Sequence, residues 1–347
     1  YNEIDAIGAT EQGLLARQKI NALIDLTPAQ YQLLLDFAND HGLIIGPGGT
    51  SGTIDEILTI ARASGATYFD ANRIMQLAGN DVLRLDHDPV TGEPLGALME
   101  GQSTNLFLWS ENFADSAWIN TQTTVSTDAT IALTGEMTAD KLVETAENSQ
   151  HTCFQSSVLV SENSAYTLSI FGKSTGESRG LRLRLATNIG LVGDARFDLD
   201  LGTVIVESGV TANITPMGDG WFRCSITGTT QAGATSAAGS GAALVLLPNN
   251  IIGYAGDGTS GVYIWGAQLE VGASPSSYIL TEASQVTRAA DQVTIPLANF
   301  PWNGGSGTLT VDGNVVAPVD DGTNLNIAGI AAAEGLTHMK TLKWVPA

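Results

Sequence analysis

Apolar and polar residues alternate along several stretches in the middle of the chain. Residues 166–170, 181–185 and 197–199 each place an apolar side chain at every second position. This period of two is typical of half-buried antiparallel strands, which point successive side chains to opposite faces. Glycine-rich turn sequences recur between such stretches, at 172–176, 218–220 and 256–258. From about residue 106 onward the pattern therefore predicts antiparallel sheets packed as a sandwich.

The first 64 residues follow a different pattern, in which apolar residues recur at helical spacing. Thr27 and Pro28 are typical of a helix start, with a capping side chain followed by proline at the first helical position. Two or three short helices are expected, over about residues 14–26, 28–42 and 54–63. This helical N-terminal segment is either an attachment or oligomerisation element or a helical cap on the same core.

The same patterns divide the chain into four segments. Residues 1–64 form the helical segment, 65–105 a connector, 106–291 the sandwich and 292–347 a small C-terminal β segment. Candidate strands in the last segment are 308–311 and 339–345. Residues 231–241 are rich in Gly, Ala, Ser and Thr and are expected to form a loop, which leads into an apolar central strand over 242–247.

Net charge narrows the range of partners. The 347-residue chain has 15 Lys and Arg against 36 Asp and Glu, which gives a formal net charge of −21. An acidic surface repels phosphate backbones and anionic lipid, so neither nucleic acid nor a membrane is an expected partner. No apolar run reaches the roughly 18–20 residues that a membrane-spanning helix needs, so membrane insertion is not expected either.

The two cysteines, Cys153 and Cys224, are too few for a disulfide scaffold. Strict alternation places Cys224 on the same strand face as Phe222 and Ile226. A buried, reduced thiol acting as a small hydrophobe is the main expectation for each cysteine. A bridge between the two is the alternative.

Four stretches carry a resemblance to a known family. They are Asp86–Glu100, Thr104–Trp118, Gly218–Cys224 and Tyr254–Asp291, and the last contains Trp265-Gly266-Ala267-Gln268-Leu269-Glu270 and Thr287-Arg288-Ala289-Ala290-Asp291. Together they resemble the virion proteins of tailed bacteriophages and prophages that carry a jelly roll like that of carbohydrate-binding modules. The resemblance covers about residues 80–295. It implies a mainly β fold, with an antiparallel jelly-roll β-sandwich after the short α-helical N-terminal segment.

The resemblance also implies a role in the virion. Proteins of this kind are structural components of a tail fibre, head fibre or other appendage, assembled in the host bacterial cytoplasm. The expected partners are sister chains in a homotrimer, other virion proteins and host-surface polysaccharide during host attachment. Two alternatives stay open: a glycan-degrading enzyme of the tailspike type, and a purely architectural decoration protein of the capsid or collar. The tail after Asp291 is too short for the full second sandwich that many family members have.

Sugar binding commonly stacks aromatic rings on pyranose faces, and several rings in the four stretches are candidates. They are Trp109, Trp118, Trp221, Tyr254, Tyr263 and Trp265. The alternative is that these rings belong to the core, which large aromatic residues dominate in sandwiches. Trp221 is expected to be the most exposed, because it lies opposite the apolar face of its strand.

Jelly rolls of the resembled type often hold a structural calcium ion between their first and last strands. Oxygen ligands suited to calcium occur near the corresponding ends of the sandwich, at Glu111, Asn112, Gln268 and Glu270. Solvated turn residues are the alternative interpretation. No other cofactor is expected.

Signals of catalysis are weak, and no catalytic residue is assigned. The four histidines are not at metal-ligand spacings, and the sequence has no nucleophile elbow and no phosphate-binding loop. A glycosidase carboxylate pair stays open among the many acidic residues. A non-enzymatic protein is the main expectation.

Overall fold

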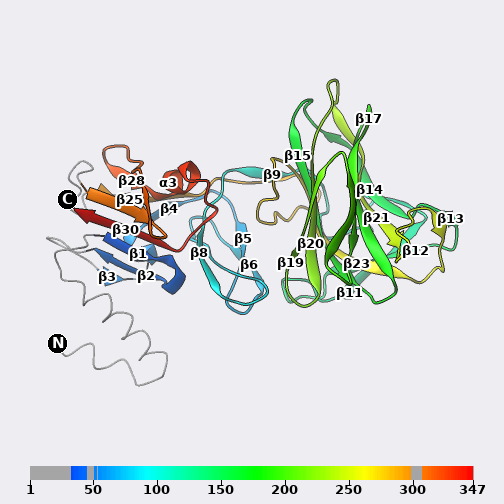
Figure 1. The fold of residues 1–347 in the computed structure, drawn as a ribbon, viewed down its shortest axis with the longest axis horizontal. Helices are drawn as coiled ribbons and strands as arrows, with labels where there is room; N and C mark the ends of the chain where they lie inside the picture. The colour runs from blue at the N-terminus through cyan, green and yellow to red at the C-terminus, as the bar shows by residue number, and fades with distance from the viewer. Residues whose placement is uncertain (1–32, 45–50, 53, 298–306, 347) are drawn as a thin grey trace, which may run out of the picture. The chain divides into compact units, whose positions relative to one another are not determined.

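The computed structural model describes residues 33–44, 51–52, 54–297 and 307–346 (Figure 1). The described residues are mainly β, and their strands pair antiparallel. They belong to two compact units, one formed by residues 60–291 and the other, called the terminal unit here, by residues 1–59 together with 292–347. Among the described residues no helix is long and apolar enough to cross a membrane. The predicted helix over 14–26 lies outside the described residues.

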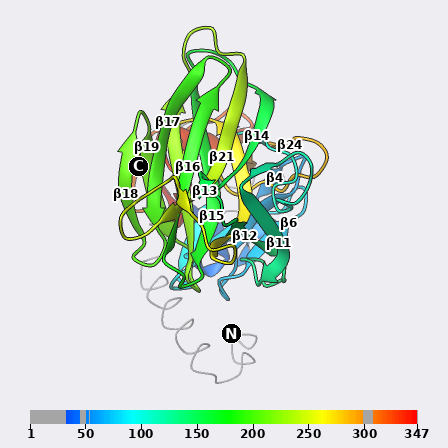
Figure 2. The same cartoon turned by 90° about the vertical axis from the view of Figure 1, so that its right-hand side faces the viewer.

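Two six-stranded sheets make up most of the 60–291 unit. The first sheet has the order β10-β14-β21-β16-β17-β18, and Figure 2 shows β14, β21, β16 and β17 side by side. Its strands are β10 (Ile119–Thr121), β14 (Thr152–Leu159), β21 (Ser236–Leu246), β16 (Arg179–Thr187), β17 (Gly190–Asp198) and β18 (Thr203–Ser208). The second sheet has the order β11-β12-β23-β15-β20-β19. Its strands are β11 (Thr123–Thr130), β12 (Ala139–Glu144), β23 (Gly261–Val271), β15 (Ala165–Ser174), β20 (Trp221–Thr229) and β19 (Thr211–Pro216).

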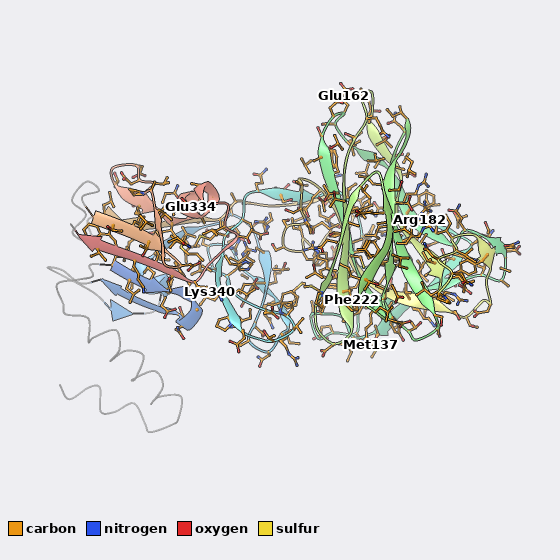
Figure 3. The ribbon with its side chains drawn as sticks, in the orientation of Figure 1. Met137, Glu162, Arg182, Phe222, Glu334 and Lys340 are labelled. Carbon is orange, nitrogen blue, oxygen red and sulfur yellow. The ribbon has the colours of Figure 1, made fainter. Side chains whose placement is uncertain are left out.

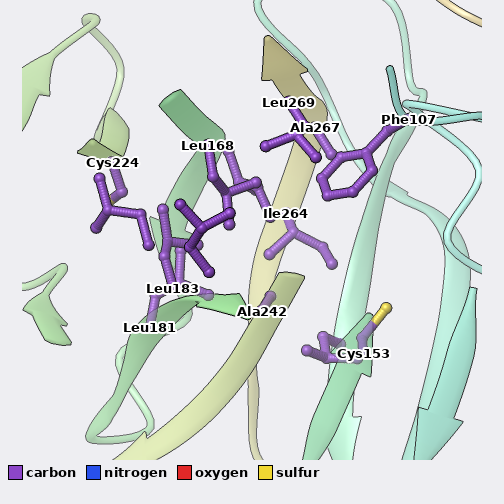
Figure 4. Close-up of a cluster of buried hydrophobic side chains, with 14 of the residues drawn as sticks. Phe107, Cys153, Leu168, Leu181, Leu183, Cys224, Ala242, Ile264, Ala267 and Leu269 are labelled. Atoms are coloured by element: carbon purple, nitrogen blue, oxygen red, sulfur yellow. The ribbon is translucent and has the colours of Figure 1, made fainter. Parts of the chain in front are cut away.

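The two sheets share one hydrophobic core. Leu181, Leu183 and Leu185 of β16 are buried in it, and so are Leu168 and Ile170 of β15 in the other sheet (Figure 4). The period of two predicted for these strands is therefore confirmed. Burying a side chain of this size stabilises the fold by about 1.5–3 kcal/mol.

Both cysteines lie in this core, one from each sheet. Cys153 and Cys224 are buried and free, so the structure has the reduced thiols and not the alternative bridge. Burial raises the pKa of both thiols well above the usual range, because a thiolate would lose its hydration there.

A second hydrophobic core lies on the other face of the second sheet. Phe171, Trp221 and Trp265 point into it from the sheet. Residues outside the sheet cover them, among them Phe69, Met75, Ala132, Leu133, Met217 and Tyr278. The predicted connector thus contributes packing to the unit. Its short strands are β5 (Ala66–Phe69), β6 (Met75–Ala78), β7 (Leu85–His87), β8 (Pro94–Leu98) and β9 (Ser103–Asn105).

Buried ion pairs join the two ends of the 60–291 unit. The Asp291 carboxylate accepts hydrogen bonds from Arg62 at 2.9 Å and from Arg84 at 2.5 Å. Arg84 also pairs with Glu100 at 2.8 Å. Arg288, on β24 (Val286–Arg288), is 1% exposed and lies 3.6 Å from Glu100. The Arg288 and Asp291 positions of the resemblance therefore belong to a structural charge cluster.

The terminal unit contains a six-stranded sheet of order β27-β26-β30-β1-β2-β3. Its strands are β27 (Asn314–Val316), β26 (Gly307–Val311), β30 (Thr341–Pro346), β1 (Leu33–Asp36), β2 (His41–Ile44) and β3 (Ser51–Gly52). The strands predicted over 308–311 and 339–345 match β26 and β30 closely. The other elements of the terminal unit are η2 (Phe37–Asn39), α2 (Ile54–Ile57), β25 (Gln292–Pro296), β28 (Asn324–Asn326), α3 (Ile327–Ala333) and β29 (His338–Met339). The strand β4 (Thr59–Ala61) contains the boundary between the two units.

The helix predicted over 28–42 is wrong for its described residues. Leu33–Asp36 is a strand paired on both sides, with β2 and β30, and Leu33, Leu34 and Leu35 are all buried. A short apolar run buried on both faces lacks the alternation of an ordinary strand, and periodicity alone cannot separate it from a helix. The helix predicted over 54–63 is also too long, because α2 ends at Ile57 and β4 follows.

The loop predicted over 231–241 is wrong for its second half. Residues from Ser236 onward belong to β21, a central strand paired with β14 and β16. Gly241 adopts a φ of +157°, and a Cβ on it would lie 2.5 Å from the Cys153 carbonyl oxygen. Glycine and alanine fit here because the neighbouring backbone leaves no room for larger side chains. The same small residues had led us to predict a loop from composition. The central strand predicted over 242–247 is confirmed up to Leu246.

Candidate functional site

The structure places four of the predicted stacking rings in the core. Trp265 is 0% exposed, Trp221 2%, Trp118 3% and Tyr254 6%. A ring buried to this extent has no free face for a sugar. Tyr263 is half-buried and packs against the second core, and Trp109 is half-buried against the first. The predicted rings are thus spread over several places and form no shared platform.

The expectation that Trp221 is the most exposed ring is wrong. The alternation was read correctly, since Cys224 and Ile226 face the first core and Trp221 faces the other way. The second layer of chain covers that outer face, and the indole Nε1 donates to the Ile131 carbonyl at 3.3 Å. The sequence pattern gave the direction of the side chain but carried no information on what covers it.

Each of the four residues proposed for calcium accepts at least one hydrogen bond within the chain. Glu270 accepts from Ser103, Gln268 and, twice, Ser276, at 2.6–2.9 Å. Gln268 Oε1 accepts from the Ile279 amide. The structure therefore brings Gln268 and Glu270 together. Calcium would have to replace contacts that already satisfy these two groups.

The other pair of proposed calcium ligands has separate partners. Glu111 Oε1 accepts from the Tyr278 hydroxyl at 3.0 Å, and Asn112 Oδ1 accepts from the Ala114 amide. Among the described residues no group of three or more His, Cys, Asp or Glu side chains is placed to hold a metal. Calcium binding stays a prediction, which the melting temperature measured with calcium and with a chelator would test.

A different set of side chains lies together on the outer side of the first sheet. The Cα register places Phe154, Gly241, Arg184, Asp194 and Ser208 in one row across five neighbouring strands. The adjacent row contains Thr152, Ala243, Arg182, Arg196 and Val206. We call these two rows the arginine face. Leucines at alternate positions of β16 fill the core, so the arginines between them point outward (Arg182 is labelled in Figure 3).

β21, which lies between β14 and β16, carries almost no side chains on the arginine face. Gly241 has none and Ala243 only a methyl group, whereas Phe154 and Arg184 stand on the strands to either side. Neighbouring strands are about 4.8 Å apart, so the backbones at Phe154 and Arg184 are about 10 Å apart. A glycine in a strand interior is typical of places where another group approaches the backbone closely. Gly239, Gly241 and Ala243 are buried, and the Phe154 ring and the Arg184 guanidinium lie over Gly239.

The second row is held by internal hydrogen bonds. Arg182 donates to Asp194 at 2.8 Å and to the Gln150 side chain at 3.3 Å. Arg196 donates to the Asn250 carbonyl at 2.9 Å and lies 4.0 Å from Asp194. These contacts fix the two guanidinium groups, and Arg182 is only 7% exposed. This row supports the face more than it offers free groups to a ligand.

Arg184 differs from its two neighbours. It is half-exposed, and within the described part of the chain it makes no hydrogen bond or ion pair. Its Nη1 atom and the Phe154 ring flank Gly239, since a Cβ on that glycine would lie 3.4 Å and 3.7 Å from them. Burial and then the adjacent Arg182 lower the pKa of Arg184, because both oppose its positive charge, and the nearby Asp194 carboxylate offsets part of this shift. Arg184 is thus the arginine of this face without a hydrogen bond or ion pair among the described residues, and it lies beside the partly exposed Phe154 ring.

The sequence analysis did not select these residues. Arginines alternating with leucines over 181–185 were interpreted only as the polar side of a strand. The Gly-Ser-Gly sequence at 239–241 was assigned to a loop, so Gly241 was not placed beside them. The signal available in the sequence was three arginines within 15 residues, 182–196, of a strongly acidic chain.

No protein-family model and no curated protein matches this sequence. Over 47% of its length the chain is similar to the enzymatically active domain of tailspike protein 4 from bacteriophage CBA120, with 14% identity and a TM-score of 0.28. That match spans 20% of the tailspike chain. Over 50% of its length it is similar to the CBM22-1 xylan-binding domain of Paenibacillus barcinonensis Xyn10C, with 11% identity and a TM-score of 0.26, and covers 94% of that domain. At these TM-scores neither protein's fold nor its activity transfers to this chain.

Proposed function

We propose that the chain is a non-enzymatic structural component of a tailed-phage particle, a tail or head fibre or appendage, and that its 60–291 unit binds host-surface glycan. The particle assignment rests on the four stretches that resemble phage virion proteins. Glycan binding rests on the arginine face. The two parts of the proposal are independent, and each has its own test.

The proposed fold of the 60–291 unit is a jelly-roll β-sandwich of the carbohydrate-binding-module type. Its two antiparallel sheets face each other across a common core. Strands far apart in sequence are neighbours, such as β14 and β21 in one sheet and β12 and β23 in the other. This arrangement is typical of jelly rolls, in which each sheet receives strands from both halves of the chain.

The observation that carries glycan binding is the row formed by Phe154, Gly241 and Arg184. The Phe154 ring and the Arg184 guanidinium lie together over the buried Gly239 and are both partly exposed. A pyranose presents an apolar face to an aromatic ring and hydroxyl oxygens to a guanidinium. Phe154 is partly exposed, as Tyr263 and Trp109 are, whereas the other four predicted rings are buried. The row therefore combines the two kinds of group that recognise a saccharide.

The non-enzymatic part of the proposal is supported by the placement of the carboxyl groups with a raised pKa. Burial raises the pKa of Asp140 to about 6 and also raises that of Glu111. A general acid of a glycosidase has a raised pKa, but it must reach the glycosidic oxygen. Asp140 is 2% exposed and accepts hydrogen bonds from the Phe113 and Asp128 amides. These bonds explain it as a structural group of the core.

In the particle, we propose that the chain forms a homotrimer and contacts other virion proteins. With a net charge of −21 per chain, close association of sister chains requires that their acidic faces be kept apart or neutralised. Light scattering of the purified chain measures the oligomer directly. A particle reconstruction that places the chain on the virion supports the particle assignment, and its absence from purified particles contradicts it.

Glycan binding is tested by titrating the full chain with polysaccharide from candidate host surfaces. The Phe154→Ala variant is expected to bind about ten- to hundredfold more weakly, since it loses the burial of an aromatic ring. Leu77→Ala, which removes an exposed apolar side chain of β6 outside the face, is the matched control. Equal binding by wild type and Phe154→Ala would contradict the assignment. Release of oligosaccharides from the same polysaccharide would contradict the non-enzymatic role.

A further inference from the structure

We infer that the buried His151 is a pH-sensitive switch, which holds the short strand β22 (Tyr254–Ala255) when its imidazole is protonated and loosens that strand when the imidazole is neutral. The inference is independent of the proposed function. It is carried by the hydrogen-bond geometry of the two ring nitrogens, because both of them face carbonyl oxygens.

His151 lies where several segments of the chain meet. It comes directly before β14 of the first sheet, and its carbonyl oxygen accepts from the Leu244 amide of β21 at 2.9 Å. Its Nδ1 lies 2.6 Å from the Gln122 carbonyl oxygen, at the corner between β10 and β11. Its Nε2 lies 3.2 Å from the Tyr254 carbonyl oxygen of β22. The side chain is 0% exposed, so solvent does not replace either contact.

Both contacts need a proton on the ring, because a carbonyl oxygen is only an acceptor. A neutral imidazole has one N–H group and one nitrogen with a lone pair, so it donates to one of the two oxygens and points its lone pair at the other. Turning the ring over does not remove this conflict. It would place a carbon about where Nδ1 lies, well inside the usual C···O separation of about 3.3–3.6 Å. The imidazolium, which has both protons, donates to Gln122 and to Tyr254.

The ionisable groups on the β22 side of the ring have a net negative charge. The Tyr254 ring packs against the imidazole with the two centroids 4.8 Å apart. Arg179 lies over the same tyrosine ring and pairs with Glu144 at 2.6 Å and with Asp257 at 3.5 Å. Two carboxylates and one guanidinium give −2 + 1, a net charge of −1. This side of the ring therefore favours the imidazolium.

Among the described residues, the other elements around the ring contribute no unpaired charge. The residues that contact His151 from the β10–β11 corner and from β21, Gln122 and Leu244, are not ionisable. The preceding residue, Gln150, accepts from Arg182 of β16, and that arginine pairs with Asp194 at 2.8 Å. Two carbonyl dipoles and the net charge behind Tyr254 thus favour the proton, and burial opposes it.

Loss of the second proton weakens the attachment of β22. This strand and β13 (Asn148–Ser149) form a two-stranded sheet (β13 is labelled in Figure 1). So small an element opens locally at a lower free energy than the central strands of the two large sheets. A hydrogen bond from an imidazolium is charge-assisted and contributes more than a neutral one. The contribution is present at low pH and is lost as the pH rises through the range in which histidine usually titrates.

Hydrogen exchange of the full chain at pH 5 and pH 8, corrected for the intrinsic exchange rate, measures this opening. Protection over residues 254–257 is expected to fall about tenfold or more between pH 5 and pH 8. In His151→Gln, whose side chain does not titrate, protection is expected to be equal at the two pH values. Asp140 titrates in both proteins, so the difference between them belongs to His151. His87→Gln, which replaces a partly buried histidine elsewhere in the unit, is the control and is expected to keep the wild-type response.

The ring nitrogens are also observable by NMR in the wild-type protein, so the test does not depend on the folding of a variant. Their chemical shifts are expected to show two N–H groups at pH 5 and one at pH 8. A single N–H group at pH 5, or two at both pH values, overturns the switch. Equal protection of residues 254–257 at pH 5 and pH 8 in the wild type also overturns it. A pH response that persists in His151→Gln overturns the assignment to His151.

Discussion

Arg179 donates its Nε and Nη2 groups to the two carboxylate oxygens of Glu144, each at 2.6 Å. Arg179 begins β16 in the first sheet and Glu144 ends β12 in the second, so the pair connects the two sheets at one edge of the core. Tyr254 donates its hydroxyl to the same carboxylate at 2.6 Å, and the Asp257 amide donates to it at 2.9 Å. The conspicuous sequence around Tyr254 and Asp257 thus has a structural role.

Replacing Glu144 by glutamine is expected to lower the free energy of unfolding by about 3–5 kcal/mol. The substitution removes the bidentate partner of Arg179 and leaves only the longer 3.5 Å contact to Asp257, and the Arg179 and Glu144 side chains are both at least nine-tenths buried. Chemical denaturation measures the change. Glu177→Gln is the control, since the Lys141–Glu177 pair is partly exposed and is expected to contribute less than about 1 kcal/mol. Equal stability of Glu144→Gln and wild type would contradict the connecting role of the pair.

Asp140 is expected to make stability depend on pH between about 4 and 6. Burial raises its pKa from 3.8 to about 6, although two backbone amides bond to the carboxylate. Because the folded pKa is above the unfolded one, this contribution is fully present below pH 4 and is lost as the pH rises through 6. The expected loss is about 3 kcal/mol. Unfolding of wild type and Asp140→Asn, compared at pH 4, 5 and 7, measures it, and a pH-independent difference would contradict it.

The two thiols are expected to be inert in the folded protein. Cys153 and Cys224 are 0% exposed, and their raised pKa keeps them protonated at neutral pH. A thiol reagent should label neither residue under native conditions and both in denaturant. Rapid native labelling would show that the core is open at these positions. Failure to label in denaturant would show a bridge.

Trp221 and Phe154 are expected to separate stability from binding. Trp221→Ala empties part of the second core and is expected to cost about 3–5 kcal/mol of unfolding free energy. Phe154→Ala removes a half-exposed ring and is expected to change stability much less while weakening glycan binding. Thermal or chemical denaturation, run beside the binding assay, gives both quantities. If Trp221→Ala weakened glycan binding with little change in stability, and Phe154→Ala left binding unchanged, the sugar site would lie at Trp221.

The sequence was sufficient for local strand geometry and insufficient for what covers each strand. Alternation correctly assigned the faces of Leu183, Arg184 and Trp221, because a strand has a fixed period of two. It could not show that a second layer of chain buries Trp221 or that the Arg184 side chain is partly exposed. It also failed at Leu33–Leu35, where burial on both faces removes the alternation. The arginine face depends on register between strands distant in sequence, which no local pattern contains.

The most direct test of the glycan-binding face is a crystal structure of the full chain with an oligosaccharide from a host polysaccharide that it binds. The sugar is expected against the outer side of the first sheet, with a ring against Phe154 and a hydroxyl within hydrogen-bond distance of the Arg184 guanidinium. Density for the saccharide at another place on the chain, with the row of Phe154, Gly241 and Arg184 left empty, would contradict the account.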